Sequence, residues 1–200
     1  MSALGRLIRR VWPVPDRVYF ERWDRRSEDP WGHLASDYER RRYEWTLAAL
    51  GGRRFGRALE MGCSLGGFTE MLAPYCDEVL GVDISEVSVE RARARLAGAA
   101  HVRVERRTLP REMPAGPFDL VVCADVLYYW TAAELSGALR QIEAAVASGG
   151  VLLLVHYRPK VRVQPLRGDE VHDLVARETR LALVAHDERG DHRLDLFEDR

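Results

Sequence analysis

Two acidic residues, Glu60 and Asp83, each close a short apolar stretch, and a glycine-rich turn follows the first of them. Around Glu60, residues 57–73 read R-A-L-E-M-G-C-S-L-G-G-F-T-E-M-L-A. Glycine has no Cβ, so Gly62 and Gly66 permit a tight turn in which the backbone approaches a ligand closely. An acid about 20 residues beyond such a turn accepts hydrogen bonds from ribose hydroxyls. The two stretches together predict a pocket for a ligand that contains a nucleoside.

Three interpretations of this turn compete. In the dinucleotide fingerprint G-x-G-x-x-G the second glycine lets the backbone approach a pyrophosphate, but Ser64 stands at that position. A plain strand-to-helix turn, with Asp83 as a helix N-cap, needs no ligand at all. A nucleoside ligand without a pyrophosphate is the third interpretation, because it tolerates a serine in the turn.

The order E-x-G-x-S-x-G resembles motif I of the class I S-adenosylmethionine (SAM)-dependent methyltransferases, whose usual form is (D/E)-x-G-x-G-x-G. In that family the acid and the turn hold the methionine end of the cofactor. The resemblance implies this role for four positions, Glu60, Gly62, Ser64 and Gly66. It also implies that Asp83, with Ile84 beside it, holds the ribose of SAM.

Composition limits the class of protein. The chain has 200 residues, 46% of them hydrophobic, and a net charge of −1, which suits one globular α/β domain and gives no polybasic footprint for nucleic acid. Its three cysteines form no C-x-x-C pair, so neither a disulfide framework nor a zinc site is indicated. The basic, apolar residues 5–13 are too few for a secretory signal or a spanning helix. We therefore expect a cytoplasmic protein without a membrane partner.

The elements that must position these residues alternate between strand and helix. Ser36 and Glu39 predict a capping box at the start of a helix that ends before Gly51, and Thr131 and Glu134 predict a second box. Strands are expected at residues 58–61, 78–83, 101–106, 118–124 and 151–155, with a closing hairpin over residues 181–197. This alternation predicts a doubly wound, mostly parallel sheet. Residues 1–52 form an N-terminal helical segment, and residues 53–200 form the core of a single domain.

A longer match resembles the nodulation protein S-like group of methyltransferases. It comprises Asp29-Pro-Trp31, Tyr38-Glu39 with Arg41, residues 59–74 and residues 125–129, which read D-V-L-Y-Y. The resemblance implies a seven-stranded, Rossmann-like sheet whose last strand is antiparallel. The prototype of the group is an N-methyltransferase that acts on an amino sugar of a chitooligosaccharide, which favours a small-molecule acceptor with an amine.

One position departs from the family pattern. Class I methyltransferases usually carry an acid after the third strand, in a pair that hydrogen-bonds the adenine amino group. Here that pair is Thr108-Leu109, so an acceptor oxygen is kept without the charge. We expect Thr108, Leu109 or the neighbouring backbone to hold the adenine.

Polar side chains follow the fourth and fifth strands, at the edge where open α/β sheets bind ligands. Asp125 and Tyr128 follow the fourth strand, and His156 follows the fifth. An amine acceptor must lose a proton, so Asp125 and His156 are candidate bases. His156 as a purely structural donor, and Tyr128 as a residue that only packs against the cofactor, are the alternatives.

The sequence therefore predicts base-assisted, metal-independent transfer of a methyl group from SAM to a small molecule, most readily an amine. An O-methyltransferase of a small natural product and a SAM-binding module without turnover are the alternatives, and a nucleotide-dependent reductase comes third. Clustered carboxylates of the metal-dependent catechol-type enzymes are missing, so we expect no metal. The oligomeric state is left open.

The N-terminal segment is predicted to cover the pocket as a lid. Trp31 and Tyr38 lie in a stretch rich in aromatic and positively charged residues just before the glycine turn. Arg41, one turn after Tyr38, is a candidate partner for the methionine carboxylate. The alternative is that Trp31 anchors a permanently packed helix.

Overall fold

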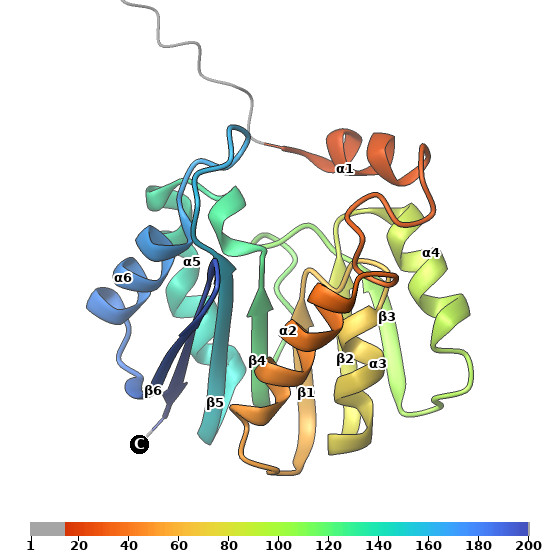
Figure 1. Ribbon diagram of the computed structural model, residues 1–200. Helices are drawn as coiled ribbons and strands as arrows, with labels where there is room; N and C mark the ends of the chain where they lie inside the picture. The colour runs from red at the N-terminus through yellow and green to blue at the C-terminus, as the bar shows by residue number, and fades with distance from the viewer. Residues whose placement is uncertain (1–14, 200) are drawn as a thin grey trace, which may run out of the picture.

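The computed structural model describes residues 15–199. Its strands form one seven-stranded sheet in the order β3-β2-β1-β4-β5-β7-β6 (Figure 1). The strands are β1 (Phe55–Met61), β2 (Cys76–Asp83), β3 (Val102–Arg106), β4 (Phe118–Ala124), β5 (Val146–Tyr157), β6 (Ala182–Arg189) and β7 (His192–Glu198). The pairs among β1 to β5 are parallel, and β7 runs antiparallel to both β5 and β6. The predicted sheet, with its reversed last strand, is confirmed.

Helices cover both faces of the sheet. They are α1 (Arg17–Asp24), α2 (Asp37–Ala48), α3 (Gly67–Leu72), α4 (Glu86–Arg95), α5 (Ala132–Ala145) and α6 (Gly168–Glu178), with short 3-10 turns η1 (Ala73–Tyr75) and η2 (Leu127–Tyr129). Successive side chains of a strand point to opposite faces. Leu59 and Val121 therefore pack with α5 and α6, whereas Ala58 and Val122 pack with α2 and α3.

Two helix starts were predicted from capping boxes, and they differ in the structure. At α5 the box is complete, because Thr131 and Glu134 exchange hydrogen bonds. At α2 the Ser36 hydroxyl accepts from the Glu39 amide at 3.4 Å, but the Glu39 carboxylate binds the guanidinium of Arg42 instead of the cap. The box at α2 is therefore only half formed.

The start of β5 is a second difference. The strand expected at residues 151–155 begins earlier, because α5 ends at Ala145 and the chain enters β5 directly at Val146. The pairing of β4 with β5 shifts between the pairs Phe118–Val146 and Leu120–Val151, and Gly149 adopts a φ of 70° within the longer segment. Gly149 and Gly150 thus lie in the irregular first part of β5, where the register with β4 shifts.

Helix α1 lies above the carboxyl end of the sheet, on the side of β3 and α4 (Figure 1). Its buried residues are the acids Glu21 and Asp24, whereas Val18 and Trp23 are exposed. Asp24 is only 1% exposed, and its carboxylate accepts hydrogen bonds from the hydroxyls of Ser85 and Ser88 at the start of α4. The helix is therefore held to the core by polar contacts. Within residues 15–199 no helix is long and apolar enough to cross a membrane.

Candidate active site

The glycine turn after β1 is bonded to the end of β2. The amides of Gly62 and Cys63 both donate to the carbonyl of Val82, at 2.8 and 3.0 Å. Gly62 has a φ of 79°, and a Cβ on it would lie 2.9 Å from a methyl group of Val126. A residue with a side chain would therefore be both strained and crowded at this position.

Asp83 ties two backbone segments together. Its carboxylate accepts the Ser64 amide on one oxygen and the Ser85 amide on the other, each at 2.9 Å. Ser64 itself has a φ of 48°, which turns its amide toward Asp83. Burial raises the pKa of Asp83 to about 6, although the side chain keeps some contact with solvent. A carboxylate oxygen has more than one lone pair, so Asp83 can still accept bonds from a ligand.

This geometry bears on the choice between a dinucleotide and a simpler nucleoside. In dinucleotide sites the pyrophosphate lies against the turn and the start of the following helix. Here the Ser64 amide is already bonded to Asp83, and α3 is only six residues long. The turn therefore fixes the carboxylate of Asp83 and leaves the Ser64 amide already bonded.

Glu60, at the end of β1, is 3% exposed. Burial raises its pKa to about 8, even though the Thr69 hydroxyl donates to the carboxylate at 2.6 Å. Glu60 is therefore mostly protonated at neutral pH, and a cationic group brought close to it favours the carboxylate form.

The segment after β3 contains a carboxylate that the sequence pattern did not reveal. The Thr108 amide donates to Glu112 at 2.5 Å, and the Thr108 hydroxyl accepts from Arg106 at 3.3 Å. Glu112 reaches Thr108 because its own amide binds the Thr108 carbonyl in a tight turn. Leu109 packs against the core, and Ile84 is half-buried beside Asp83. An acid thus lies beside Thr108 in space, although none stands at the position directly after the strand where the family pattern has one.

Asp125, directly after β4, is the central charge of the opposite half of the site. It has a φ of 52°, its Oδ1 accepts the Tyr157 amide at 2.8 Å, and its Oδ2 lies 3.0 Å from Nη1 of Arg42. Burial raises the pKa of Asp125, but the charge of Arg42 and the hydrogen bond from His192 outweigh it and hold that pKa well below the usual range. Asp125 is therefore held as a carboxylate, and its role as a base stays a prediction that this low proton affinity does not favour.

The buried cation comes from α2, one residue later than predicted. Arg41 is exposed, whereas the side chain of Arg42 is 6% exposed and pairs with Glu39 and Asp125. Although Nη1 of Arg42 is close to Asp125, its N–H groups are not directed at an acceptor, so it remains a buried donor without a hydrogen bond. Arg42 is thus the arginine at the site.

His192, the first residue of β7, also reaches Asp125. Its Nε2 lies 3.5 Å from Oδ2 of Asp125, and its Nδ1 lies 3.0 Å from the hydroxyl of Tyr38. No local motif marks His192. It could have been found only from the expectation that the closing hairpin pairs with the fifth strand, where His192 lies opposite Tyr157.

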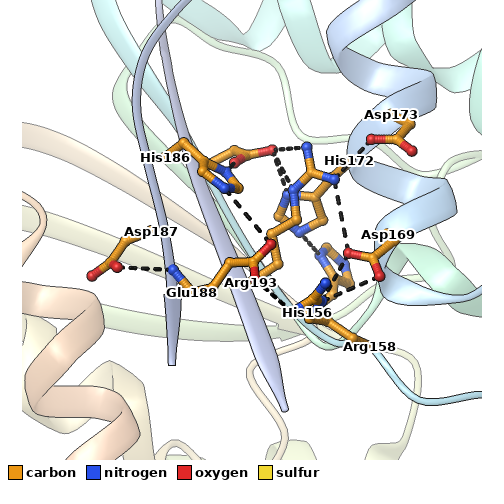
Figure 2. A network of polar contacts seen from close by, with 10 residues as sticks. His156, Arg158, Asp169, His172, Asp173, His186, Asp187, Glu188 and Arg193 are labelled. Atoms are coloured by element: carbon orange, nitrogen blue, oxygen red, sulfur yellow. Dashed lines mark hydrogen bonds and ion pairs between the residues drawn. The ribbon is translucent and has the colours of Figure 1, made fainter. Parts of the chain in front are cut away.

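His156 does not face a ligand. It is fully buried, its Nε2 accepts the Leu127 amide at 3.2 Å, and its Nδ1 lies 3.1 Å from Nε2 of His172. His172 continues to Asp195 at 2.8 Å, and Asp195 also binds His186 of β6 at 2.6 Å, so the chain of polar contacts runs across β5, α6, β7 and β6 (Figure 2). The prediction that His156 is a base is wrong, because the lone pair that would take the proton is occupied and burial lowers the pKa of His156.

Tyr128, on η2, is 5% exposed and packs against Tyr129 and His156. Burial raises the pKa of Tyr128, and its hydroxyl binds Asp125. Tyr128 therefore orients Asp125 and stays protonated.

The N-terminal segment touches the turn and the loop after β4. A Cβ on Gly67 would lie 2.9 Å from Leu34, and the ring of Phe20 meets that of Tyr129 at 5.1 Å. Trp31 is 38% exposed and packs on Trp23, with ring centres 6.1 Å apart. These contacts place residues 15–52 against the site.

Comparison with known proteins agrees with this arrangement. The family profile described as Nodulation protein S (NodS) matches residues 18–183. The chain belongs to the NodS family. Nodulation protein S of Bradyrhizobium diazoefficiens is 35% identical over 138 residues, which cover 67% of this chain and 65% of that protein. Nodulation protein S of Rhizobium tropici is 33% identical over 64% of this chain and 54% of that protein. The chain thus spans a little over half to just under two thirds of these NodS relatives.

Solved structures give the same result. The N-methyltransferase NodS from Bradyrhizobium japonicum WM9, in complex with S-adenosyl-L-homocysteine (SAH), superposes with a TM-score of 0.81 at 25% identity, covering 92% of this chain and 99% of that one. A methyltransferase structure from Pseudomonas syringae, itself described as putative, is 37% identical with a TM-score of 0.72, covering 80% and 98%. The predicted resemblance to the NodS group is confirmed. His192 lies beyond the stretch that the NodS profile matches.

Proposed function

We propose that the chain transfers a methyl group from SAM to an amine of a small molecule. The observation that carries this proposal is the permanent carboxylate of Asp125, held at the same edge of the sheet as the glycine turn and Asp83. The NodS structure bound to SAH supports the choice of cofactor.

The residues present fit SAM. Asp83 accepts the ribose hydroxyls, Thr108 with Leu109 and Ile84 surrounds the adenine, and Glu60 with the turn at Gly62, Ser64 and Gly66 holds the methionine end. Arg42 has a buried N–H group without an acceptor, and it replaces Arg41 as the cation for a ligand carboxylate. When bound, SAM supplies a methyl group on a positively charged sulfur, which a neutral amine attacks directly.

The chain contributes orientation and charge to this step. The amine nitrogen becomes positive as it takes the methyl group, and a fixed carboxylate nearby stabilises that charge more than it stabilises the neutral reactant. Tyr128 and the Tyr157 amide hold Asp125 in place for this purpose. Asp125 therefore acts as an electrostatic group.

We further propose that residues 15–52 act as a lid. Trp31 and Tyr38 are 38% and 47% exposed, so neither side chain is committed to the core. Asp24, Leu34 and Phe20 meet α4, the turn and η2 respectively. A cover attached at three places around the pocket excludes water from the reacting groups. Residues 1–14 of the expected N-terminal segment lie outside the described residues.

Mass spectrometry of a reaction mixture tests the proposal. The protein is offered SAM together with a partly deacetylated chitin oligosaccharide, an aminoglycoside and a phenol, and parallel reactions contain SAH in place of SAM. We expect methylation of an amine and none in the SAH control. Methylation of the phenol alone would identify an O-methyltransferase, and SAM binding without any product would identify a binding module.

A further inference from the structure

Three side chains from distant parts of the sequence form a line of contacts at the carboxyl edge of the sheet. Asp125 follows β4, His192 begins β7, and Tyr38 is the second residue of α2. His192 lies between the other two, with Nε2 3.5 Å from Asp125 and Nδ1 3.0 Å from the Tyr38 hydroxyl. The line connects a fixed negative charge to a hydroxyl near the surface.

With a neutral His192 the protons along this line have one consistent arrangement. Asp125 is a permanent carboxylate and only accepts, so Nε2 of a neutral His192 carries the hydrogen. Nδ1 then has a free lone pair, which accepts the hydrogen of the Tyr38 hydroxyl. Burial and the nearby acids Glu39 and Asp191 raise the pKa of Tyr38, so its hydroxyl stays protonated.

Exposure shows which end of the line meets a ligand. The side chain of His192 is 5% exposed and that of Asp125 is 19% exposed, whereas Tyr38 is 47% exposed. The Tyr38 oxygen keeps a lone pair after it donates to His192. A protonated amine can therefore reach the line only through Tyr38 or along the open side of Asp125.

We infer that Tyr38 and His192 remove the proton from the acceptor ammonium, an inference that rests on the proposed methyl transfer to an amine. The ammonium N–H bond breaks as its proton moves to the Tyr38 oxygen, and the original hydroxyl proton moves to Nδ1 of His192. The amine gains a lone pair for attack on the methyl group, and His192 becomes an imidazolium next to Asp125. Tyr38 is the catalytic residue because it touches the substrate, and His192 is a positioning and proton-storing residue behind it.

Other charged groups around His192 define its setting. Tyr157 of β5 meets the imidazole ring at 5.5 Å, and Arg189 of β6 lies opposite His192 in the hairpin. Arg42 neutralises part of the charge of Asp125 from α2. Asp125 is thus shared between Arg42 and His192.

Rates of methyl transfer at several pH values test the inference. Tyr38→Phe and His192→Gln are compared with wild type, using SAM and the amine that wild type methylates best among chitin-derived amino sugars and aminoglycosides. His101→Gln is the matched control, since His101 precedes β3 and its side chain bonds the Ala73 carbonyl. Thermal unfolding and SAM affinity are measured for every variant.

Below the pKa of the acceptor amine we expect each variant to lose about 10²-fold in kcat, the lower end of the effect of a general base. The loss should shrink as the pH rises, because the amine then loses its proton to water unaided. The double variant should be no slower than either single variant, because both changes interrupt one transfer.

The outcomes separate this inference from the proposed function. Wild-type turnover with unchanged kcat in Tyr38→Phe and His192→Gln would overturn the relay alone, as would a loss that is the same at every pH. Failure of wild type to methylate any amine would overturn the proposed function and the relay with it.

Discussion

Two chains of hydrogen-bonded histidines lie near the carboxyl edge of this sheet, and they differ in how they end. In the first, three fully buried side chains, His156, His172 and Asp195, follow one another, and Asp195 also binds the half-exposed His186 on the far side of the hairpin. At the site end this chain stops at the Leu127 amide, which occupies Nε2 of His156. In the second, His192 joins Asp125 to Tyr38, whose ring is half-exposed. We call them the closed chain and the open chain.

The difference shows what makes a titratable residue available for chemistry. A histidine at a strand end is a base only if one of its lone pairs meets a ligand or a group that does. In the closed chain the Leu127 amide occupies the last lone pair, so the chain holds η2 in place. In the open chain the last group is a hydroxyl with a lone pair to spare.

The largest expected effect comes from removing the charge at the head of the open chain. Asp125→Ala leaves Arg42 buried with Glu39 as its remaining partner, which costs about 3 kcal/mol in the free energy of unfolding. Alanine is also strained at a φ of 52°. Urea unfolding measures the loss, and methyl transfer should be abolished.

Asp125→Asn is the control for the backbone, because asparagine tolerates this conformation. It should recover part of the stability and none of the activity. If Asp125→Ala were as stable as wild type, Arg42 would not depend on this carboxylate.

A substitution in the closed chain should lower stability and leave catalysis unchanged. His172→Phe leaves the N–H of His156 without a partner and removes one hydrogen bond from Asp195, which keeps Arg193, at a cost of about 1 to 3 kcal/mol in stability. The pH dependence of kcat should be unchanged. A pH profile shifted like that of His192→Gln would show that the two chains are not functionally distinct.

The two acids near the glycine turn, Asp83 and Glu60, also differ in how far their carboxylates are exposed to solvent. Asp83 keeps lone pairs toward solvent, so Asp83→Ala should weaken SAM binding by about 1 to 3 kcal/mol. Calorimetry measures this change, with Asp77→Ala, at an exposed position of β2, as the control. Equal SAM affinity in Asp83→Ala and wild type would mean that Asp83 does not hold the ribose.

Glu60 is buried, and its substitution should give the smallest effect on SAM binding. With a pKa of about 8 it carries a proton in the free protein at pH 7, and it must lose that proton to meet the SAM ammonium. Binding then releases a proton, so SAM affinity rises with pH by up to about tenfold per unit until pH 8. Glu60→Gln should bind SAM more weakly and without this dependence. A pH-independent affinity in wild type would place the ammonium elsewhere.

The sequence predicted the features that depend on neighbouring residues. The alternation of strands and helices, the glycine turn, the acid at Asp83 and the capping box at Thr131 follow from local spacing, and the structure contains all of them. It did not predict which residues meet across the fold. The prediction named Arg41 where the structure buries Arg42, because the spacing of residues along α2 did not show which face of the helix is buried. Glu112 and His192 reach their partners only through a turn and a strand pairing that carry no motif.

The central claim is that the site at the carboxyl ends of β1 and β2 holds SAM and not a dinucleotide. Titration calorimetry of the wild-type protein with SAM, SAH and NAD tests it most directly. We expect SAM and SAH to bind and NAD to bind far more weakly, because the Ser64 amide that would meet a pyrophosphate is bonded to Asp83. Tighter binding of NAD than of SAH would contradict the assignment of this site.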